Sequence, residues 1–259
     1  MSVKEVLAHE TRVDIDAPVE EVWKALTEAG EIARWFAPHM TVAPGAGGSV
    51  VADWGAGIVW KNAIEVWEPN KHLRLVETRD HFISPEATQG KMEPCRLLQD
   101  YYLEGAGGKT VLRMVHSGFG TSDNWIQEYE GTRDGWSVCF SRLKMLLERH
   151  KNETVHNVLM TALCYGMDHL KAMSRVIAAM PKTFEITLRG KYSVAGLLRE
   201  LNDSSLSVSV QPSSMGTVAY FELLLYGLPE EKAKSVENEW RGRLTELFPK
   251  EPRRSTAAG

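Results

Sequence analysis

Two polar side chains stand out because strand alternation places them among apolar residues. Met114 and His116 occupy one face of a predicted strand, and Arg113 occupies the other. Because Arg113 belongs in water, we expect His116 to point inward. Asn62 shares a face with Trp60 on another predicted strand. Such a set is typical of a ligand pocket, which is mostly apolar with a few polar groups for orientation. Polar core residues that pair with each other would give the same pattern.

An inward histidine could also perform acid–base chemistry, since its ordinary pKa lies near neutral pH. His116 is therefore a candidate general acid or base for a cyclase or dehydratase. Such a residue needs a carboxylate partner, and strand alternation leaves Glu77 and Asp100 as candidates.

Other catalytic and metal-binding motifs are missing from the sequence. It contains no G-x-S-x-G, no H-E-x-x-H and no C-x-x-C, so we predict no metal and no cofactor. Gly108, Lys109 and Thr110 resemble the end of a phosphate-binding loop. The full pattern requires a glycine where Leu103 stands, and a strand follows instead of a helix. These residues therefore predict a hairpin turn.

Residues 11–150 alternate between strand and helix patterns in a simple order. Strands are predicted at 11–16, 40–43, 48–54, 58–67, 72–80, 95–104 and 109–117, with glycine-rich turns between several of them. Short helices are predicted at 18–27 and 31–36, and a long helix at 124–150. Trp136, Phe140, Leu143 and Leu147 form one face of that long helix. The order predicts an α+β fold in which a curved antiparallel sheet wraps a long C-terminal helix.

Residues 151–259 give a less regular pattern. Residues 151–180 carry apolar side chains at helical spacing and are predicted to be a helical connector. Residues 181–250 predict a small β-α-β-β-α segment, with strands at 183–189, 205–211 and 216–226 and helices at 193–202 and 229–247. We expect a disordered tail over 251–259. This division predicts one main domain followed by a smaller α+β segment.

Composition excludes several classes of protein. With 30 Lys and Arg against 34 Asp and Glu, the net charge of −4 argues against nucleic acid as a partner. No apolar run approaches the roughly 20 residues of a membrane span. The three cysteines cannot all pair, which suits reduced thiols and a cytoplasmic location. All but one of the eight tryptophans precede residue 150, so the two segments are expected to differ in role.

Several motifs, taken in order, resemble a known superfamily. They are Ala17-Pro-Val-Glu-Glu-Val-Trp-Lys-Ala-Leu-Thr27, Ile32-Ala-Arg-Trp-Phe36, Pro44-Gly-Ala-Gly-Gly48, His116-Ser-Gly-Phe119, Gly135-Trp136 and Arg142-Leu-Lys-Met-Leu-Leu-Glu148. Over residues 11–150 the chain resembles the SRPBCC (START-like) superfamily, in the branch of the activator of the heat-shock chaperone ATPase. The resemblance implies a helix-grip fold with an internal hydrophobic cavity. Members bind lipids, sterols, polyketides or other apolar molecules, and some are cyclases or dehydratases.

The leading hypothesis is therefore non-enzymatic binding of a small hydrophobic or amphipathic ligand. The cavity is expected to be lined by Trp35, Trp54, Trp60, Asn62, Met114, His116, Trp136 and Phe140. The superfamily has no universal catalytic residues, so the resemblance adds none to His116. Two alternatives stay open: a cyclase or dehydratase, and an interaction protein. In the second alternative, residues 151–259 contact a chaperone, another regulator or a second copy of the chain.

Overall fold

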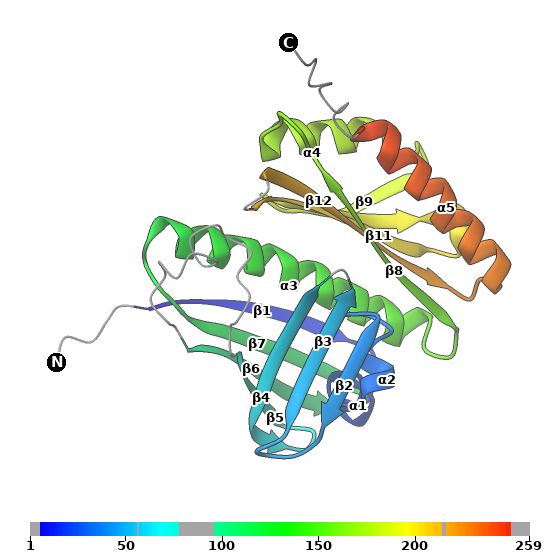
Figure 1. Cartoon of the computed structure of the whole chain (residues 1–259). Helices are drawn as coiled ribbons and strands as arrows, with labels where there is room; N and C mark the ends of the chain where they lie inside the picture. Colours follow the sequence, from blue (N-terminus) through cyan, green and yellow to red (C-terminus); the bar gives the residue numbers. More distant parts are fainter. Residues whose placement is uncertain (1–5, 56, 78–95, 214–215, 250–259) are drawn as a thin grey trace, which may run out of the picture.

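The computed structural model describes residues 6–55, 57–77, 96–213 and 216–249. The long helix α3 (Asp123–Arg149) lies between two sheets (Figure 1). A seven-stranded sheet lies on one side of α3, and a five-stranded sheet lies on the other. Helices α4 (His169–Ala178) and α5 (Glu230–Leu247) cover the outer face of the second sheet.

The first sheet confirms the predicted antiparallel wrap around a long helix. Its order is β1-β7-β6-β5-β4-β3-β2, and every neighbouring pair is antiparallel. The strands are β1 (Leu7–Ile15), β2 (His39–Ala43), β3 (Ser49–Gly55), β4 (Ile58–Glu68), β5 (His72–Glu77), β6 (Leu97–Ala106) and β7 (Lys109–Phe119). Residues 78–80 and 95, the ends of two predicted strands, lie outside the described residues.

Two short helices follow β1. Helix α1 (Val19–Thr27) begins after Pro18 and carries Glu20 and Glu21 in its first turn. Proline and acidic residues there favour a helix start, because proline presets φ and carboxylates meet the positive end of the helix dipole. Helix α2 (Ala29–Ile32) is shorter than predicted and ends before Trp35.

The predicted apolar face of α3 packs on the first sheet. Trp136, Phe140, Leu143 and Leu147 are all buried, and they share one cluster with residues of α1 and of the first sheet. The turn between β2 and β3 shows why glycine is needed locally: a Cβ on Gly48 would lie 1.9 Å from the carbonyl oxygen of Ala43. Tight glycine turns let neighbouring strands pair along the curved sheet.

The predicted helical connector over 151–180 is wrong in its first half. Residues Val155–Leu163 form strand β8, and only His169–Ala178 is helical, with Asp168 as the N-cap. Val158 to Leu163 is a nearly continuous apolar run, which fits a strand and a helix equally well by periodicity. Pairing with β12 (Gly216–Tyr226) decides in favour of the strand.

The predicted helix over 193–202 is also wrong. Ser193–Leu198 form strand β10, all six residues are buried, and only Arg199–Leu201 make a short 3-10 turn. Strand β10 lies between β9 (Phe184–Arg189) and β11 (Ser204–Ser213), and a strand buried on both faces reads as a continuous apolar run. The segment from residue 181 is therefore β-β-β-β-α, and the sheet order is β8-β12-β11-β10-β9. The tail over 251–259 lies outside the described residues.

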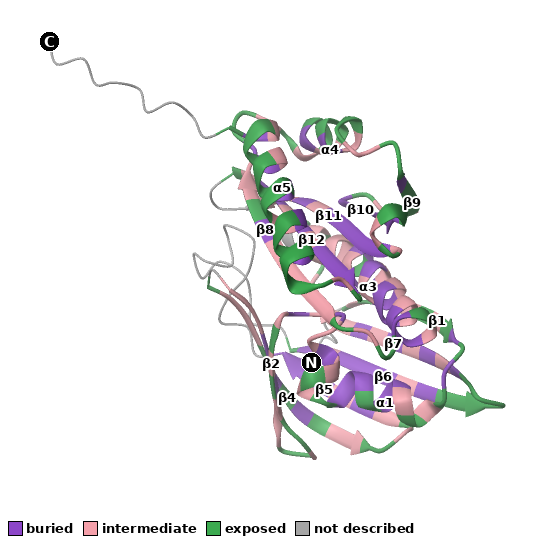
Figure 2. Ribbon diagram, turned by 90° about the vertical axis from the view of Figure 1, so that its right-hand side faces the viewer, coloured by how far each residue is buried: buried purple, intermediate pink, exposed green. Residues whose placement is uncertain are grey.

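The two faces of the second sheet differ in chemistry. Along β11, Leu206, Val208 and Val210 are completely buried and pack in one cluster with residues of α4 and α5. The alternate residues are serines, and their face is turned toward α3. Figure 2 shows α5 exposed along much of its outer side. The second sheet thus has an apolar outer face and a mixed inner face, on which serines occur together with Leu224 and Tyr226 of the first core cluster.

Three features of the described residues concern the general class of protein: membrane spans, metal sites and cysteines. None of the described helices combines the length and apolar content that a membrane span requires. Among the described residues, no three His, Cys, Asp or Glu side chains gather as a metal site would demand. Cys139 and Cys164 are free thiols.

Candidate functional site

Four of the predicted cavity residues lie in the packed layer between the first sheet and α3. Asn62, Met114, His116 and Phe140 are all buried, and His116 is only 1% exposed. The Nε1–H of Trp136 donates to Nδ1 of His116 at 3.2 Å, and rings of His9 and Phe119 contact the imidazole. These contacts hold His116 as a core residue, away from any described opening.

The two predicted carboxylate partners of His116 lie on different faces of the sheet. Asp100 is across from Val115 in the register and binds Arg74 and His72, each at 2.7 Å, so it does not share the face of His116. Glu77 is buried across from Asn62. Asp100 is therefore excluded as the partner of His116, whereas Glu77 lies on the same inner face as His116 and stays a prediction.

Trp35 is a structural residue in this fold. It is 2% exposed, and its Nε1–H donates to the carbonyl oxygen of Ala25 at 2.8 Å. The ring of its neighbour Phe36 lies 5.4 Å away between centroids and joins the aromatic group described next. Sequence alone could not decide which of these two adjacent aromatic residues faces a pocket, because both follow the end of a short helix.

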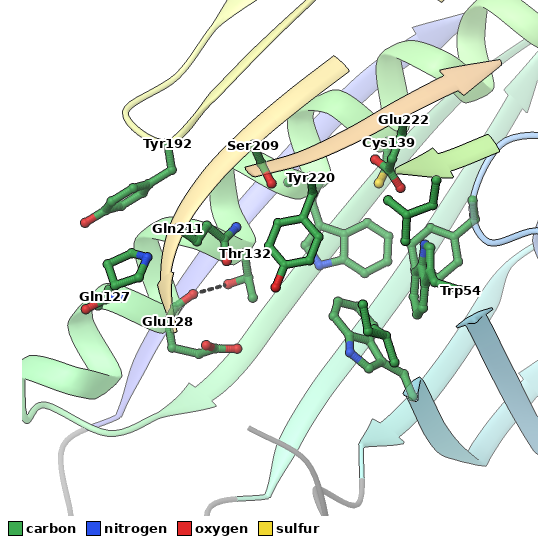
Figure 3. A pocket seen from close by; sticks show the side chains of 18 residues that line it. Trp54, Gln127, Glu128, Thr132, Cys139, Tyr192, Ser209, Gln211, Tyr220 and Glu222 are labelled. Carbon is green, nitrogen blue, oxygen red and sulfur yellow. Dashed lines mark hydrogen bonds between the residues drawn. The ribbon is translucent and has the colours of Figure 1, made fainter. Parts of the chain in front are cut away.

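A pocket with a volume of about 200 Å³ lies between α3 and the inner face of the second sheet (Figure 3). Trp54, Trp60 and Trp136, three of the predicted cavity residues, line it, whereas Trp35, Asn62, Met114, His116 and Phe140 do not. The pocket is therefore formed by both parts of the chain. It is not the space beneath the first sheet.

Aromatic rings from the first domain make the floor of this pocket. Phe36 is stacked on Trp136 with centroids 5.5 Å apart, and it meets Trp54 edge-on at 5.0 Å. Trp54 and Trp60 are in edge contact at 4.9 Å. Edge-to-face and offset stacks of this kind are the favoured geometries of aromatic pairs, so the four rings support one another in position.

The opposite wall comes from the second sheet. Ser209 and Tyr220 are directly across from each other on β11 and β12, and Glu222 follows on the same face. Figure 3 shows Glu222 beside Cys139 at one end of the pocket, with Gln127 and Glu128 toward the other. Burial raises the pKa of Tyr220, because the phenolate would lose its hydration.

Helix α3 supplies the third side through one face. Gln127, Glu128, Gly131, Thr132, Gly135, Trp136 and Cys139 all line the pocket. These positions are three to five apart or adjacent, as one helical face requires. Burial raises the pKa of the Cys139 thiol to about 12, so this group stays protonated and is a poor nucleophile near neutral pH.

A buried ion pair joins α3 to the second sheet beside the pocket. The Arg142 guanidinium is 1% exposed and donates to Oε2 of Glu222 at 2.6 Å and to the hydroxyl of Ser207. The Glu222 carboxylate raises the pKa of Arg142 and opposes the effect of burial. This pair fixes Glu222 at the pocket wall.

A second polar contact connects the helix side of the pocket to β1. Nε2 of His9 lies 3.2 Å from Oγ1 of Thr132, which donates to the carbonyl oxygen of Glu128 at 2.9 Å. Burial, followed by the charge of Arg133, lowers the pKa of His9 to about 4. His9 is therefore neutral at pH 7.

Sequence reasoning missed Phe36, Tyr220 and Glu222. A usable signal did exist on β11, where Ser205, Ser207 and Ser209 alternate with apolar residues and predict one polar face. Nothing in the sequence indicated that this face would lie against α3.

A curved antiparallel sheet that holds a long helix defines a helix-grip protein, and the comparisons with known proteins agree. The family described as "Activator of Hsp90 ATPase homolog 1-like protein" matches residues 16–148, and this chain belongs to that family. The match ends at the C-terminus of α3, so the second sheet lies outside it. A comparison with curated proteins found no match.

Three solved structures illustrate the similarity. Protein MLL2253 from Mesorhizobium loti is 27% identical, with 54% of this chain and 96% of that chain covered and a TM-score of 0.45. The Aha1 dimer from Colwellia psychrerythraea is 22% identical, covering 56% and 99%, with a TM-score of 0.44. DynU16, from the dynemicin biosynthetic locus, is 18% identical, covering 93% and 96%, with a TM-score of 0.44.

Proposed function

We propose that this chain binds a small aromatic or apolar ligand, without converting it, in the pocket between α3 and the second sheet. The proposal rests on one observation: the aromatic floor borders a surface of α3 on which two glycines provide no side chain. Gly131 and Gly135 are four residues apart in the middle of α3, and both line the pocket.

These glycines are not required by the backbone. Neither has a positive φ, so other residues could adopt their conformations. Apart from its own turns of helix backbone, a Cβ on Gly131 would come no closer than 3.8 Å to its surroundings, and a Cβ on Gly135 would have nothing within 4 Å. Each glycine costs the helix about 0.8–1.0 kcal/mol relative to alanine. What their missing side chains provide is open volume in the pocket, which favours a ligand as its occupant.

The volume fits a ligand with one ring or two small ones. An engineered apolar cavity of ~150 Å³ holds benzene, and this pocket is about 200 Å³. A single-ring ligand that removed roughly 200 Å² of apolar surface from water would gain about 5 kcal/mol. That free energy corresponds to a dissociation constant of roughly 0.2 mM. Larger natural ligands that displaced more surface would bind more tightly.

Binding is favoured over catalysis because the pocket lacks a poised acid–base group. None of the residues that line it is a histidine, and His116 lies in the core. Glu222 is held by Arg142, and the high pKa of Cys139 keeps that thiol protonated. The described lining of this pocket thus supports binding better than the proton transfers of a cyclase or dehydratase.

A partner for residues 151–259 remains a prediction. The second sheet is covered by α3 on one face and by α4 and α5 on the other. Its uncovered edges are β8 and β9, so a second copy or another protein would have to use an edge or the outer sides of the helices. Light scattering on the full chain would detect a homodimer. A cytoplasmic location is likewise an inference, supported by the free thiols.

Titration with ethylbenzene tests the proposed function, with tryptophan fluorescence as the readout. Three tryptophans line the pocket, so we expect a saturable change with a dissociation constant of roughly 0.1–1 mM. The matched control is the variant Trp60→Ala, which removes one ring of the floor and should weaken binding several-fold. A response that never saturates, or that is equal in the variant, would count against binding at this site.

A further inference from the structure

The charged side chains that line the pocket directly are all acidic. Glu128 and Glu222 line it, and no lysine, arginine or histidine is among the lining residues. The remaining walls are aromatic rings and neutral polar groups. A ligand carboxylate would lose its hydration there and find no cation to replace it, so the lining disfavours anions.

Glu222 presents a hydrogen-bond acceptor to the pocket. Arg142 engages Oε2, and no other described residue hydrogen-bonds to Oε1. Because the guanidinium is buried behind the carboxylate and does not line the pocket, the ion pair turns its negative end toward the open space. The neighbouring hydroxyls of Ser209 and Tyr220 also make no hydrogen bond within the described part of the chain. This wall can therefore accept several hydrogen bonds from one ligand group.

The opposite side offers the faces and edges of four aromatic rings. Trp54, Trp60 and Trp136 are indoles, the ring type that attracts cations most strongly. A cation within about 6 Å of such a ring is attracted by the ring's quadrupole, and more strongly when water is excluded. The floor and the wall thus favour the same charge on the ligand.

We propose that the preferred ligand is a small aromatic amine bound as its cation, with its ring against the tryptophan floor and its ammonium group donating to Glu222. This inference rests on the proposed function, since it names the chemical class that the same pocket takes. The ammonium hydrogens satisfy Oε1 of Glu222 and the hydroxyls beside it, while the ring occupies the space beside Gly135.

Four probes with one common ring test the inference on the full chain. They are 2-phenylethylamine, 3-phenylpropanoate, 2-phenylethanol and ethylbenzene, titrated near neutral pH under identical salt. We expect the amine to bind at least roughly tenfold more tightly than both the carboxylate and the alcohol. If ethylbenzene binds but the amine is no better than the alcohol, the inference fails and the proposed function stands. If none of the four binds, the proposed function fails as well.

Variants then test whether Glu222 is the residue that makes the pocket prefer a cationic ligand. Glu222→Gln should lower the ratio of amine to ethylbenzene affinity at least roughly tenfold, since the carboxylate is lost. The matched control is Glu239→Gln, which removes the same charge from the exposed side of α5 and should leave the ratio as it is. Should Glu222→Gln fail to fold with Arg142 unpaired, the double variant Arg142→Met/Glu222→Gln removes both charges and should show the same loss. An unchanged ratio in a folded variant would overturn the assignment of Glu222.

Discussion

Replacing Gly135 separates the stability of α3 from the use of the pocket. In Gly135→Ala the helix gains about 0.8–1.0 kcal/mol, because alanine is the better helix former and its Cβ meets no neighbour within 4 Å. In a chain of this size, that gain raises Tm by roughly 2–4 °C. In Gly135→Leu the helix keeps most of the gain, but the side chain projects into a pocket of only about 200 Å³. We therefore expect a protein at least as stable as the wild type that no longer binds ethylbenzene.

The assays are thermal unfolding followed by circular dichroism and the fluorescence titration with ethylbenzene. Gly242 provides the matched control, since it lies in α5 and its Cβ would also have nothing within 4 Å. Gly242→Leu should give a similar rise in Tm and leave ligand affinity intact. Wild-type affinity in a folded Gly135→Leu protein would refute the location of the site. A loss of more than about 2 kcal/mol of stability would instead refute the claim that open space lies beside this glycine.

Three further predictions concern groups around the pocket. The pKa of His9 is about 4 in the folded protein and has the ordinary value of 6.5 in the unfolded chain. Between these two pH values only the unfolded chain binds a proton at His9. The free energy of unfolding should therefore fall as pH drops from about 6.5 to 4, by up to about 1.4 kcal/mol per pH unit. Urea unfolding of His9→Phe should lack this part of the pH dependence, and parallel curves for the two proteins would contradict it. Glu222→Leu should lower the free energy of unfolding by roughly 3–5 kcal/mol, because it leaves the buried Arg142 cation without a partner. The double variant Arg142→Met/Glu222→Leu should recover most of that loss in the same assay. Equal stability of the single and double variants would speak against a buried pair. Arg34 donates to the carbonyl oxygens of residues 150, 151 and 153. Arg34→Ala should therefore lower the free energy of unfolding by about 1–3 kcal/mol and speed hydrogen exchange over 150–154. Unchanged exchange there would contradict a stabilising role for these hydrogen bonds.

The first domain could be predicted from sequence because its signals are local and agree with one another. Helix α1 follows a proline and carries two acidic residues in its first turn, and α3 shows its apolar face at regular spacing. In the second segment, the apolar runs at 155–163 and 193–198 carry no periodicity that separates a strand from a helix. Pairing between strands far apart in the chain decided both cases.

The candidate site was predictable only on one of its sides. Trp54, Trp60 and Trp136 were expected around a cavity because aromatic residues gather in the first domain. The opposite wall, with Tyr220 and Glu222, depends on how the second sheet packs across α3, and no local pattern encodes that packing. The expectation of a cavity beneath the first sheet came from the fold's usual geometry. In this chain, large side chains such as Met114 and Phe140 are buried there.

The position of a bound ligand tests the central claim most directly. A crystal of the full chain soaked with 4-bromoethylbenzene would locate the bromine by its anomalous scattering. The account predicts a single strong peak between α3 and the second sheet, within contact distance of Trp60, Gly135 or Tyr220. A peak beneath the first sheet beside His116, with no bromine near Gly135, would contradict it.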